Sequence, residues 1–248
     1  MELLKTLTPA ETYFLVHKAE MSQKQFLRFT LMDLILKGVL NIVEIEKDNV
    51  KYPYMLAGVN FATYTPKPYE ESFLRACKFD EGYQTSLKNY ITIILPLTKR
   101  YKRQIGQTPH MGGYFYRTWL QRNLIGGYSF TNVGAQAATE LKDLLKNAND
   151  EYHINGAVTE TKKLLGNNII LLTGFSSQDL TVFDEEMKRK ETAGTITGGD
   201  TGIGWWYFDS GVSNGFDADY GSASDSSGDS SGDGDSGCSG CGGCGGGD

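Results

Sequence analysis

The distribution of charge and glycine divides the chain into two parts that cannot fold in the same way. Residues 1–190 carry all 24 Lys and Arg residues and 20 of the 30 acidic ones, a net charge of +4. Residues 191–248 carry the other 10 acidic residues, no basic residue, 18 of the 30 glycines and three of the four cysteines. The sequence therefore predicts a folded body large enough for a substantial core, followed by a disordered acidic tail that is too poor in apolar residues to fold alone.

The body shows no sign of a membrane segment. No stretch approaches the roughly 18 apolar residues that a spanning helix needs. Met1–Leu7 is too short for a secretory signal, and a helix start follows it at once. We therefore expect a cytoplasmic protein. Cys77, the only cysteine outside the tail, lies in a helical pattern and is expected to be a small core residue.

Two helix starts are visible near the beginning of the chain. Thr8 and Glu11 have the spacing of a capping box, with Pro9 at the first helical position. A second helix is predicted to start at Ser22 and to stop at Gly38. The β-branched, alternating segments 39–46 and 50–56 then predict a β-hairpin. Helix, helix and hairpin in this order form the sequence outline of a winged helix.

The opening of the first helix is repeated 59 residues later. Pro9–Leu15 and Pro68–Leu74 share the pattern P-x-E-x-x-F-L. This match favours a duplicated module over coincidence. We therefore expect a mostly helical α+β chain with two tandem winged-helix-like modules, at 1–62 and 66–190, and the low-complexity acidic tail at 191–248.

The second module is predicted to be the longer one. Helices are expected over 69–77, 85–95, 114–125, 131–147, 156–165 and 179–190. Pro96 is expected to kink or end the second of them. The run Tyr128–Gly134 resembles the Y-x-(L/F)-T-x-x-G sequence that leads from the wing to the last helix in many bacterial winged-helix regulators.

Two features together resemble a poorly characterised bacterial family. One is the L-T-P-A-E helix opener at Leu7–Glu11, followed by an L-x-x-L-I-L-K-G-V-L run that includes Met32–Leu40. The other is the Gly- and Cys-rich C-terminal tail. The resemblance implies a helical, winged-helix-like body and assigns no catalytic residues. Members of that family commonly carry transmembrane segments, and this sequence departs from them by showing none.

The tail cysteines are the residues of this sequence that most directly indicate metal-binding or redox chemistry. Cys238, Cys241 and Cys244 are spaced so that neighbouring thiolates can converge on one soft metal ion, which makes zinc or an iron–sulfur cluster possible. A fourth ligand would have to come from Asp248, Cys77, solvent or another chain. The alternatives are modification or cross-linking of the thiols, or cysteines without a chemical role.

A basic run interleaved with aromatic residues is the best nucleic-acid candidate. Its cations are Lys99, Arg100, Lys102, Arg103, Arg117 and Arg122, and its aromatic residues are Tyr101, Tyr114, Tyr116 and Trp119. Phosphate contacts need such cations, and a winged helix would supply a helix of groove size. Against this hypothesis, the body is only +4, and the run can equally be a solvated face above core aromatics. The acidic tail would compete for this patch, or could fold over it as an autoinhibitory polyanion.

These observations predict a non-enzymatic interaction or scaffold module that recognises protein or nucleic acid, with its oligomeric state left open. The alternatives are a winged-helix DNA-binding regulator and a metal-binding protein that acts through the tail cysteines. An enzyme is the weakest reading, because no triad, paired carboxylates or closed metal set stands out.

Overall fold

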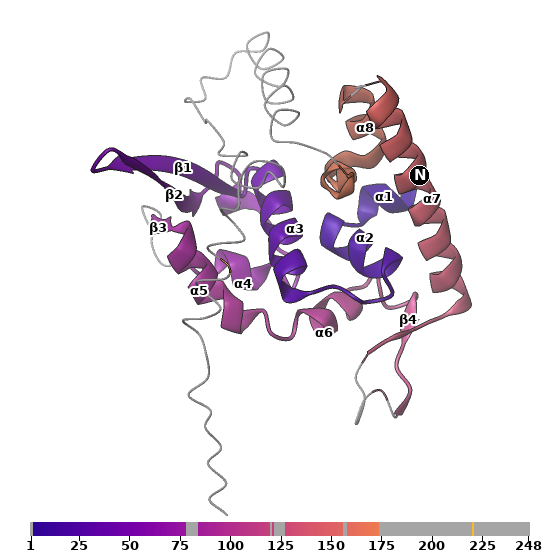
Figure 1. Cartoon of the computed structure of the whole chain (residues 1–248). Helices are drawn as coiled ribbons and strands as arrows, with labels where there is room; N and C mark the ends of the chain where they lie inside the picture. The colour runs from indigo at the N-terminus through magenta and orange to yellow at the C-terminus, as the bar shows by residue number, and fades with distance from the viewer. Residues whose placement is uncertain are drawn as a thin grey trace, which may run out of the picture.

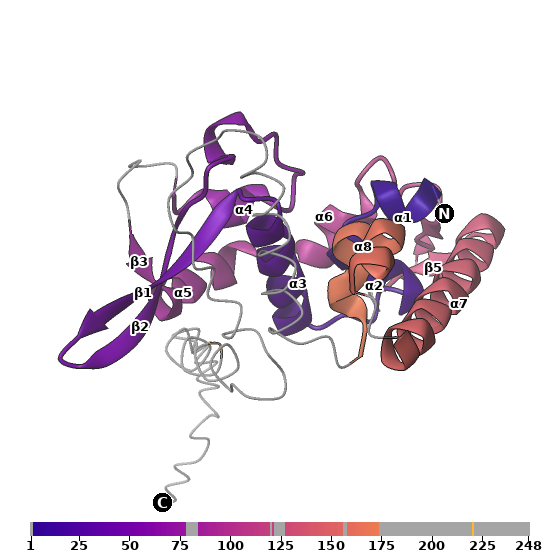
Figure 2. The same ribbon diagram turned by 90° about the horizontal axis from the view of Figure 1, so that it is seen from above.

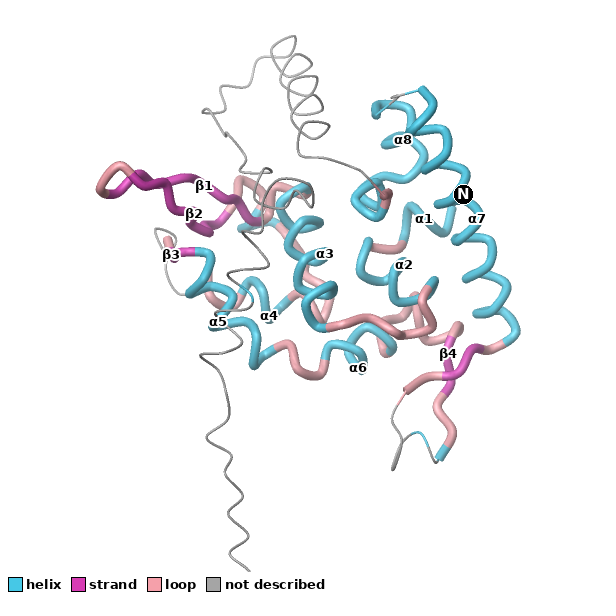
Figure 3. Tube along the Cα trace, viewed as in Figure 1, coloured by secondary structure: helices cyan, strands magenta, loops and turns pink. Residues whose placement is uncertain are grey.

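The computed structural model of the chain describes residues 2–77, 84–119, 121, 127–155, 158–173 and 220. The helices are α1 (Glu2–Thr6), α2 (Pro9–Val16), α3 (Gln23–Leu36), α4 (Glu71–Leu74), α5 (Leu87–Leu97), α6 (Tyr101–Gly106), α7 (Asn132–Asn155) and α8 (Val158–Leu165). The strands are β1 (Leu40–Lys47), β2 (Val50–Ala57), β3 (Thr85–Ser86), β4 (Phe115–Tyr116) and β5 (Ser129–Phe130). Short 3-10 helices cover Phe61–Thr63 (η1) and Gly166–Leu171 (η3). The predicted class, α+β and mostly helical, is confirmed, as Figure 3 shows.

Helix α3 runs through the middle of the body. The antiparallel sheet, in the order β1-β2-β3, lies on one side of it together with α4 and α5 (Figures 1 and 2). Helices α1, α2, α7 and α8 lie on the other side. The two-stranded sheet β4-β5 leads directly into α7.

Both predicted helix starts are formed by reciprocal hydrogen bonds. The Thr8 hydroxyl accepts from the Glu11 N–H over 3.3 Å, and the Glu11 carboxylate accepts from the Thr8 N–H over 2.9 Å. Ser22 and Gln25 make the same two bonds at the start of α3, over 3.2 and 2.9 Å. Helix α3 ends just before Gly38, whose φ of +64° lies in the left-handed region that glycine adopts without strain.

Strands β1 and β2 form the predicted hairpin, with Lys47 opposite Val50 at its closed end. Asp48 and Asn49 between them have φ values of 53° and 60°. Two positive φ values are what a tight two-residue hairpin turn requires, and Asn and Asp tolerate them better than most residues. Strand β3 extends the sheet by pairing with β2.

The helix predicted over 114–125 does not form at its start, although Trp119 and Gln121 are helical. Phe115 and Tyr116 form β4, which pairs with β5 so that Phe115 lies opposite Phe130. The buried Phe115 ring lies 5.3 Å from the ring of Phe14 and 5.1 Å from that of Phe130. Successive side chains of an extended strand point to opposite faces, so Phe115 turns inward while Tyr116 faces out.

Other predicted helices differ in extent. Helix α5 begins only after Thr85 and Ser86, because these two residues pair with β2. It also continues through Pro96, so the proline does not end it. Helix α4 is a single turn within the expected 69–77, and the helix expected over 179–190 lies outside the described residues.

One hydrophobic core extends from α1 to the end of η3. Polar contacts join the same segments, because the Asn168 amide of η3 donates to the carbonyls of Leu4 and Leu7 over 2.9 and 3.2 Å. The division into modules at 1–62 and 66–190 stays a prediction. Whatever its outcome, these two lengths of chain share a core.

Each copy of the repeated motif makes aromatic contacts with the other half of the chain. Phe14 of the first copy contacts the rings of Phe115 and Tyr128, at 5.3 and 5.6 Å between centroids. Phe73 of the second copy contacts Phe26 of α3, at 5.5 Å. Both motif phenylalanines are fully buried. The two halves are therefore interlocked by their first helices.

The substitution Gly134→Ala tests how tightly α7 packs against the Tyr114 backbone, just before β4. A Cβ at Gly134 would lie 2.0 Å from the Tyr114 carbonyl oxygen, so the backbone must move. We expect a loss of about 1–3 kcal/mol in the free energy of unfolding, measured by urea denaturation, although alanine ordinarily favours a helix. Gly113→Ala is the control, since nothing lies within 4 Å of its Cβ position. A Gly134→Ala protein as stable as the wild type would contradict this packing.

Candidate functional site

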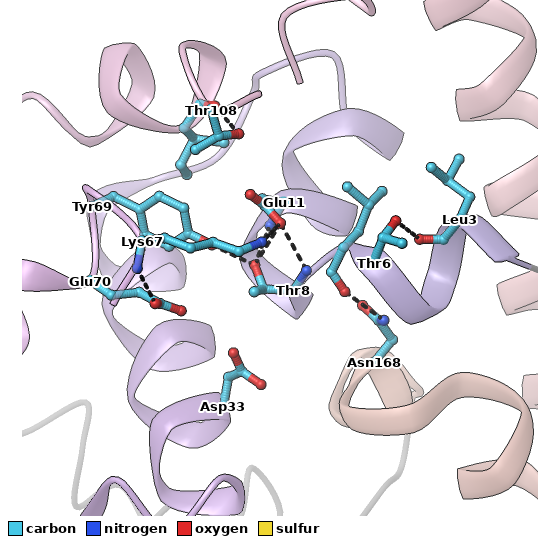
Figure 4. A network of polar contacts seen from close by, with 12 residues as sticks. Leu3, Thr6, Thr8, Glu11, Asp33, Lys67, Tyr69, Glu70, Thr108 and Asn168 are labelled. Carbon is cyan, nitrogen blue, oxygen red and sulfur yellow. Dashed lines mark hydrogen bonds and ion pairs between the residues drawn. The ribbon is translucent and has the colours of Figure 1, made fainter. Parts of the chain in front are cut away.

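Three carboxylates are buried between the two copies of the repeated motif. Glu11 and Glu70 are fully buried, and Asp33 is 1% exposed. Removing a carboxylate from water is costly unless it is paired and hydrogen-bonded, so the partners decide whether the fold tolerates these groups. Figure 4 shows part of the network, in which the Lys67 and Thr8 side chains meet at the Glu11 carboxylate.

The two motifs make the same local bond and then bond to each other. Glu11 accepts from the Thr8 N–H over 2.9 Å, and Glu70 accepts from the Lys67 N–H over 2.7 Å. Across the copies, the Lys67 ammonium lies 2.5 Å from the Glu11 carboxylate. The hydroxyls of Thr8 and Tyr69 lie 2.7 Å apart. The residue three positions before each acid therefore also reaches into the other copy.

Lys37 neutralises the other two acids. Its ammonium lies 2.7 Å from Asp33 and 3.4 Å from Glu70, and it donates to the Tyr64 hydroxyl over 3.1 Å. Burial disfavours the charge on Lys37, but the two carboxylates outweigh it and raise the pKa of the ammonium. Because this pKa is raised on folding, the stabilisation is complete at neutral pH and is lost only as the pH rises through the raised value. Asp33 also accepts from the Asn167 amide over 2.7 Å.

A cavity of about 310 Å³ opens beside this network. It is lined by residues 4–9 and by η3, with the charged groups of Asp33, Lys37 and Lys67 at its wall. Each of these three groups already has an ion-pair partner. Their charges therefore pair with one another and with Glu11, and these ion pairs hold α2, α3 and the second motif together.

The predicted basic run forms a second feature, on the surface around α6. Arg103 of α6 and Arg117, which follows β4, line one open depression of about 600 Å³. Gln107, Tyr116 and Tyr128 line it as well, and no carboxylate is among the described residues at its wall. Two guanidinium groups that are 14 positions apart in the sequence thus face one concave surface. We call this the arginine depression.

Tyr128 organises the arginine depression. Its ring centroid lies 5.3 Å from the Arg117 guanidinium, a cation–π distance, and its hydroxyl donates to the Lys102 carbonyl over 3.0 Å. The ring can approach α6 because Gly106 has no side chain; a Cβ there would lie 2.8 Å from it. Burial raises the pKa of the Tyr128 hydroxyl, and the positive charges of Arg117 and Arg103 partly oppose the rise. Both guanidinium groups therefore act on one ring.

Aromatic side chains are exposed at the arginine depression and close to it in the sequence. Tyr116, at its wall, is 51% exposed, and Trp119, two residues beyond Arg117, is 71% exposed. Tyrosine and tryptophan are enriched at binding interfaces, because each combines a large apolar ring with a polar group.

The other cations of the predicted run are placed differently. Lys99, Arg100 and Lys102 are exposed around the start of α6, with the Lys102 ammonium 5.9 Å from the ring centroid of Tyr101. They extend the positive surface without lining the depression. Arg122 lies outside the described residues.

The tail cysteines Cys238, Cys241 and Cys244 also lie outside the described residues, so zinc or iron–sulfur binding there stays a prediction. Within the described part of the chain, no group of three or more His, Cys, Asp or Glu side chains is placed to hold a metal ion. Cys77 is buried, and burial raises the pKa of its thiol to about 11. It is the small, unreactive core residue that the sequence predicts.

Sequence reasoning missed two parts of these features. It did not predict that Gln107 and Tyr128 lie beside Arg103 and Arg117, although Tyr128 begins the run Tyr128–Gly134. It also missed the bonds between the copies. Their signal was the repeated acid three residues after a helix start, which marks a capping group whose charge then needs a partner if the helix is buried.

Comparison with known proteins finds no family model, no curated protein and no solved structure that matches this chain. The resemblance to a bacterial family therefore stays a prediction. Among the helices that the structure describes, none is long and apolar enough to cross a membrane.

The ion pair between the copies can be tested with a double-mutant cycle. Lys67→Met is expected to lower the free energy of unfolding by about 3 kcal/mol, because it leaves the Glu11 carboxylate buried beside an apolar group. Adding Glu11→Gln should recover part of the loss, since it removes the charge and keeps an acceptor for the Thr8 N–H. The control, Lys5→Met, changes an exposed lysine beside the same cavity and should stay within about 0.5 kcal/mol. If the double variant lost as much free energy of unfolding as the two single variants together, Lys67 and Glu11 would have no energetic coupling.

Proposed function

We propose that this chain is a non-catalytic binding module that takes single-stranded nucleic acid at the arginine depression. The observation that carries the proposal is the meeting of Arg103 and Arg117 with the exposed ring of Tyr116 at one depression, and the exposed Trp119 follows Arg117 by two residues. Guanidinium groups bind phosphate oxygens with two parallel donors, and aromatic rings stack on bases. This combination is the one that proteins use for single strands.

An unpaired strand fits this surface better than a duplex. Stacking on Tyr116 or Trp119 needs a base that is free of its own neighbours, as in a single strand or a loop. Helix α6 has only six residues, about 9 Å of helix, and so offers little to a major groove.

Tandem winged-helix-like modules form the finer part of the proposal. In each half, a P-x-E-x-x-F-L motif precedes further helices and an antiparallel hairpin, β1-β2 in the first half and β4-β5 in the second. The equivalent bonds of Glu11 and Glu70 also support a common origin. In this arrangement the arginine depression is formed by the hairpin of the second module and the helix before it.

Charge removal at the arginine depression tests the phosphate contacts. Arg103→Ala and Arg117→Gln should each weaken binding of a labelled oligonucleotide about tenfold in low salt, measured by fluorescence anisotropy on the full-length chain. Each should also reduce the salt slope of log K by about 0.7, because one phosphate contact is lost. Glutamine is chosen at 117 because it retains a donor for the Gln121 carbonyl, which Arg117 contacts over 2.9 Å.

The matched control is Lys163→Ala, which removes an exposed cation on α8, at the far end of the body from α6 (Figure 1). It should leave affinity and slope unchanged. Equal losses for all three variants would mean that binding follows net charge alone, and would contradict a site at this depression.

Ring removal tests the stacking contact. Trp119→Ala should weaken binding by about 1–3 kcal/mol without changing the salt slope, while Trp119→Phe should retain most of the affinity. An acidic peptide serves as the competitor. The acidic peptide could displace the labelled oligonucleotide as effectively as unlabelled oligonucleotide does. The surface would then recognise negative charge and not bases, and a protein partner would replace nucleic acid in this proposal.

A further inference from the structure

The cavity beside the buried ion pairs has a wall that is built from four separate segments. They are residues 4–9, which lead from α1 into α2, helix α3, Lys67 just before the second motif, and residues 166–168 of η3. Figure 4 shows one side chain from each segment: Thr8, Asp33, Lys67 and Asn168. The volume of about 310 Å³ is near the lower limit for small-molecule sites, which span roughly 300–1,000 Å³. The cavity can therefore hold a small molecule.

Asn168 places an unused hydrogen-bond acceptor at this wall. Its side chain is 1% exposed and lines the cavity. The amide nitrogen donates to the carbonyls of Leu4 and Leu7, over 2.9 and 3.2 Å, which fixes the orientation of the amide. Its Oδ1 atom has no hydrogen-bond partner among the residues that the structure describes. A buried carbonyl oxygen without a partner is costly, so we expect a donor to occupy this position.

Lys67 places unused donors at the same wall. An ammonium group has three N–H donors, and in the described part of the chain the structure gives Lys67 one acceptor, the Glu11 carboxylate. Lys37 differs, because two carboxylates and the Tyr64 hydroxyl take its three donors. Lys5 adds an exposed ammonium group to the lining. The wall therefore offers N–H donors as well as an acceptor.

The charges around the cavity are balanced. Three buried acids and three lysines lie at its wall or one ion pair behind it: Glu11, Asp33 and Glu70, and Lys5, Lys37 and Lys67. A ligand with a net charge would upset this balance, whereas a neutral molecule with one positive and one negative end would preserve it. The positive end has an acceptor at Asn168, and the negative end has donors at Lys67 and Lys5.

We propose that this cavity binds a small zwitterion, a free amino acid, with its ammonium group at Asn168 and Asp33 and its carboxylate at Lys67. The Asp33 carboxylate retains lone pairs for a further donor beside its bonds to Lys37 and to the Asn167 amide. The bound molecule bridges α3, η3 and the second motif. This site shares no lining residue with the arginine depression and does not rest on the proposed function.

Ligand analogues test both contacts on the unaltered full-length chain. The probes are glycine and alanine, with trimethylglycine, which has no N–H donor, and glycinamide, which has no carboxylate. Glycine and alanine should shift the backbone amide signals of residues 4–8 and 166–168, with a Kd of about 1 mM or tighter. Trimethylglycine and glycinamide should each bind about tenfold more weakly or not at all, because each loses a hydrogen bond that involves a charged group.

Three results of this titration would overturn the proposal. The first is the absence of shifts in residues 4–8 and 166–168 with either amino acid. The second is binding of trimethylglycine as tight as that of glycine, which would show that no N–H is donated at Asn168. The third is a set of shifts that is confined to the arginine depression, which would place the amino acid at the other surface.

Two variants test the lysine contacts. Lys67→Met combined with Glu11→Gln removes the ammonium and its buried counter-charge together, and should weaken glycine binding about tenfold. Lys5→Met removes an exposed cation and should weaken it about twofold. Lys163→Ala, on the exposed surface of α8, is the control and should bind glycine as the wild type does. Unchanged binding by the folded double variant would overturn the carboxylate contact; if this variant does not fold, the analogue titration decides.

Discussion

The contact between Lys67 and Glu11 is the constraint on which the rest of the structure depends. Glu11 caps α2 and is fully buried, so its charge needs a partner inside the fold. That partner comes from the second copy of the same motif, and the bond between the hydroxyls of Thr8 and Tyr69 runs beside it. Once these contacts form, α2 lies against the second half of the chain, and the second motif lies against α3.

The packing between the two halves of the chain also determines the shape of the arginine depression. Phe14, carried by the helix that Glu11 caps, packs against Phe115 and Tyr128. Phe115 anchors the strand that ends just before Arg117, and the Tyr128 ring contacts the Arg117 guanidinium and covers Gly106 of α6. A line of packed side chains therefore leads from the buried ion pair to the two arginines. The geometry of the arginine depression follows from the core, although none of its cations is buried in it.

Local signals in the sequence were sufficient for α2, α3 and the β1-β2 hairpin, whereas α1 was not predicted. The capping residues Thr8 and Ser22 and the turn residues at 48–49 act through bonds within a few positions, so they can be read directly. Strand β4 could not be read, because a two-residue strand has no periodicity and is fixed by the distant Phe14 and Phe130. The meeting of Arg103 and Arg117 was hidden for the same reason: the sequence identified both cations, but their juxtaposition depends on how α6 and β4 pack.

The most direct test is to map oligonucleotide binding on the full-length chain by backbone amide chemical shifts. The account predicts that a short single strand shifts the signals of Gly106, Gln107, Tyr116 and Arg117 first, with the residues around the buried Glu11–Lys67 pair unchanged. Shifts that cluster on α7, α8 or the β1-β2 hairpin instead, or no shifts at saturating concentration in low salt, would contradict the assignment of the arginine depression as the binding surface.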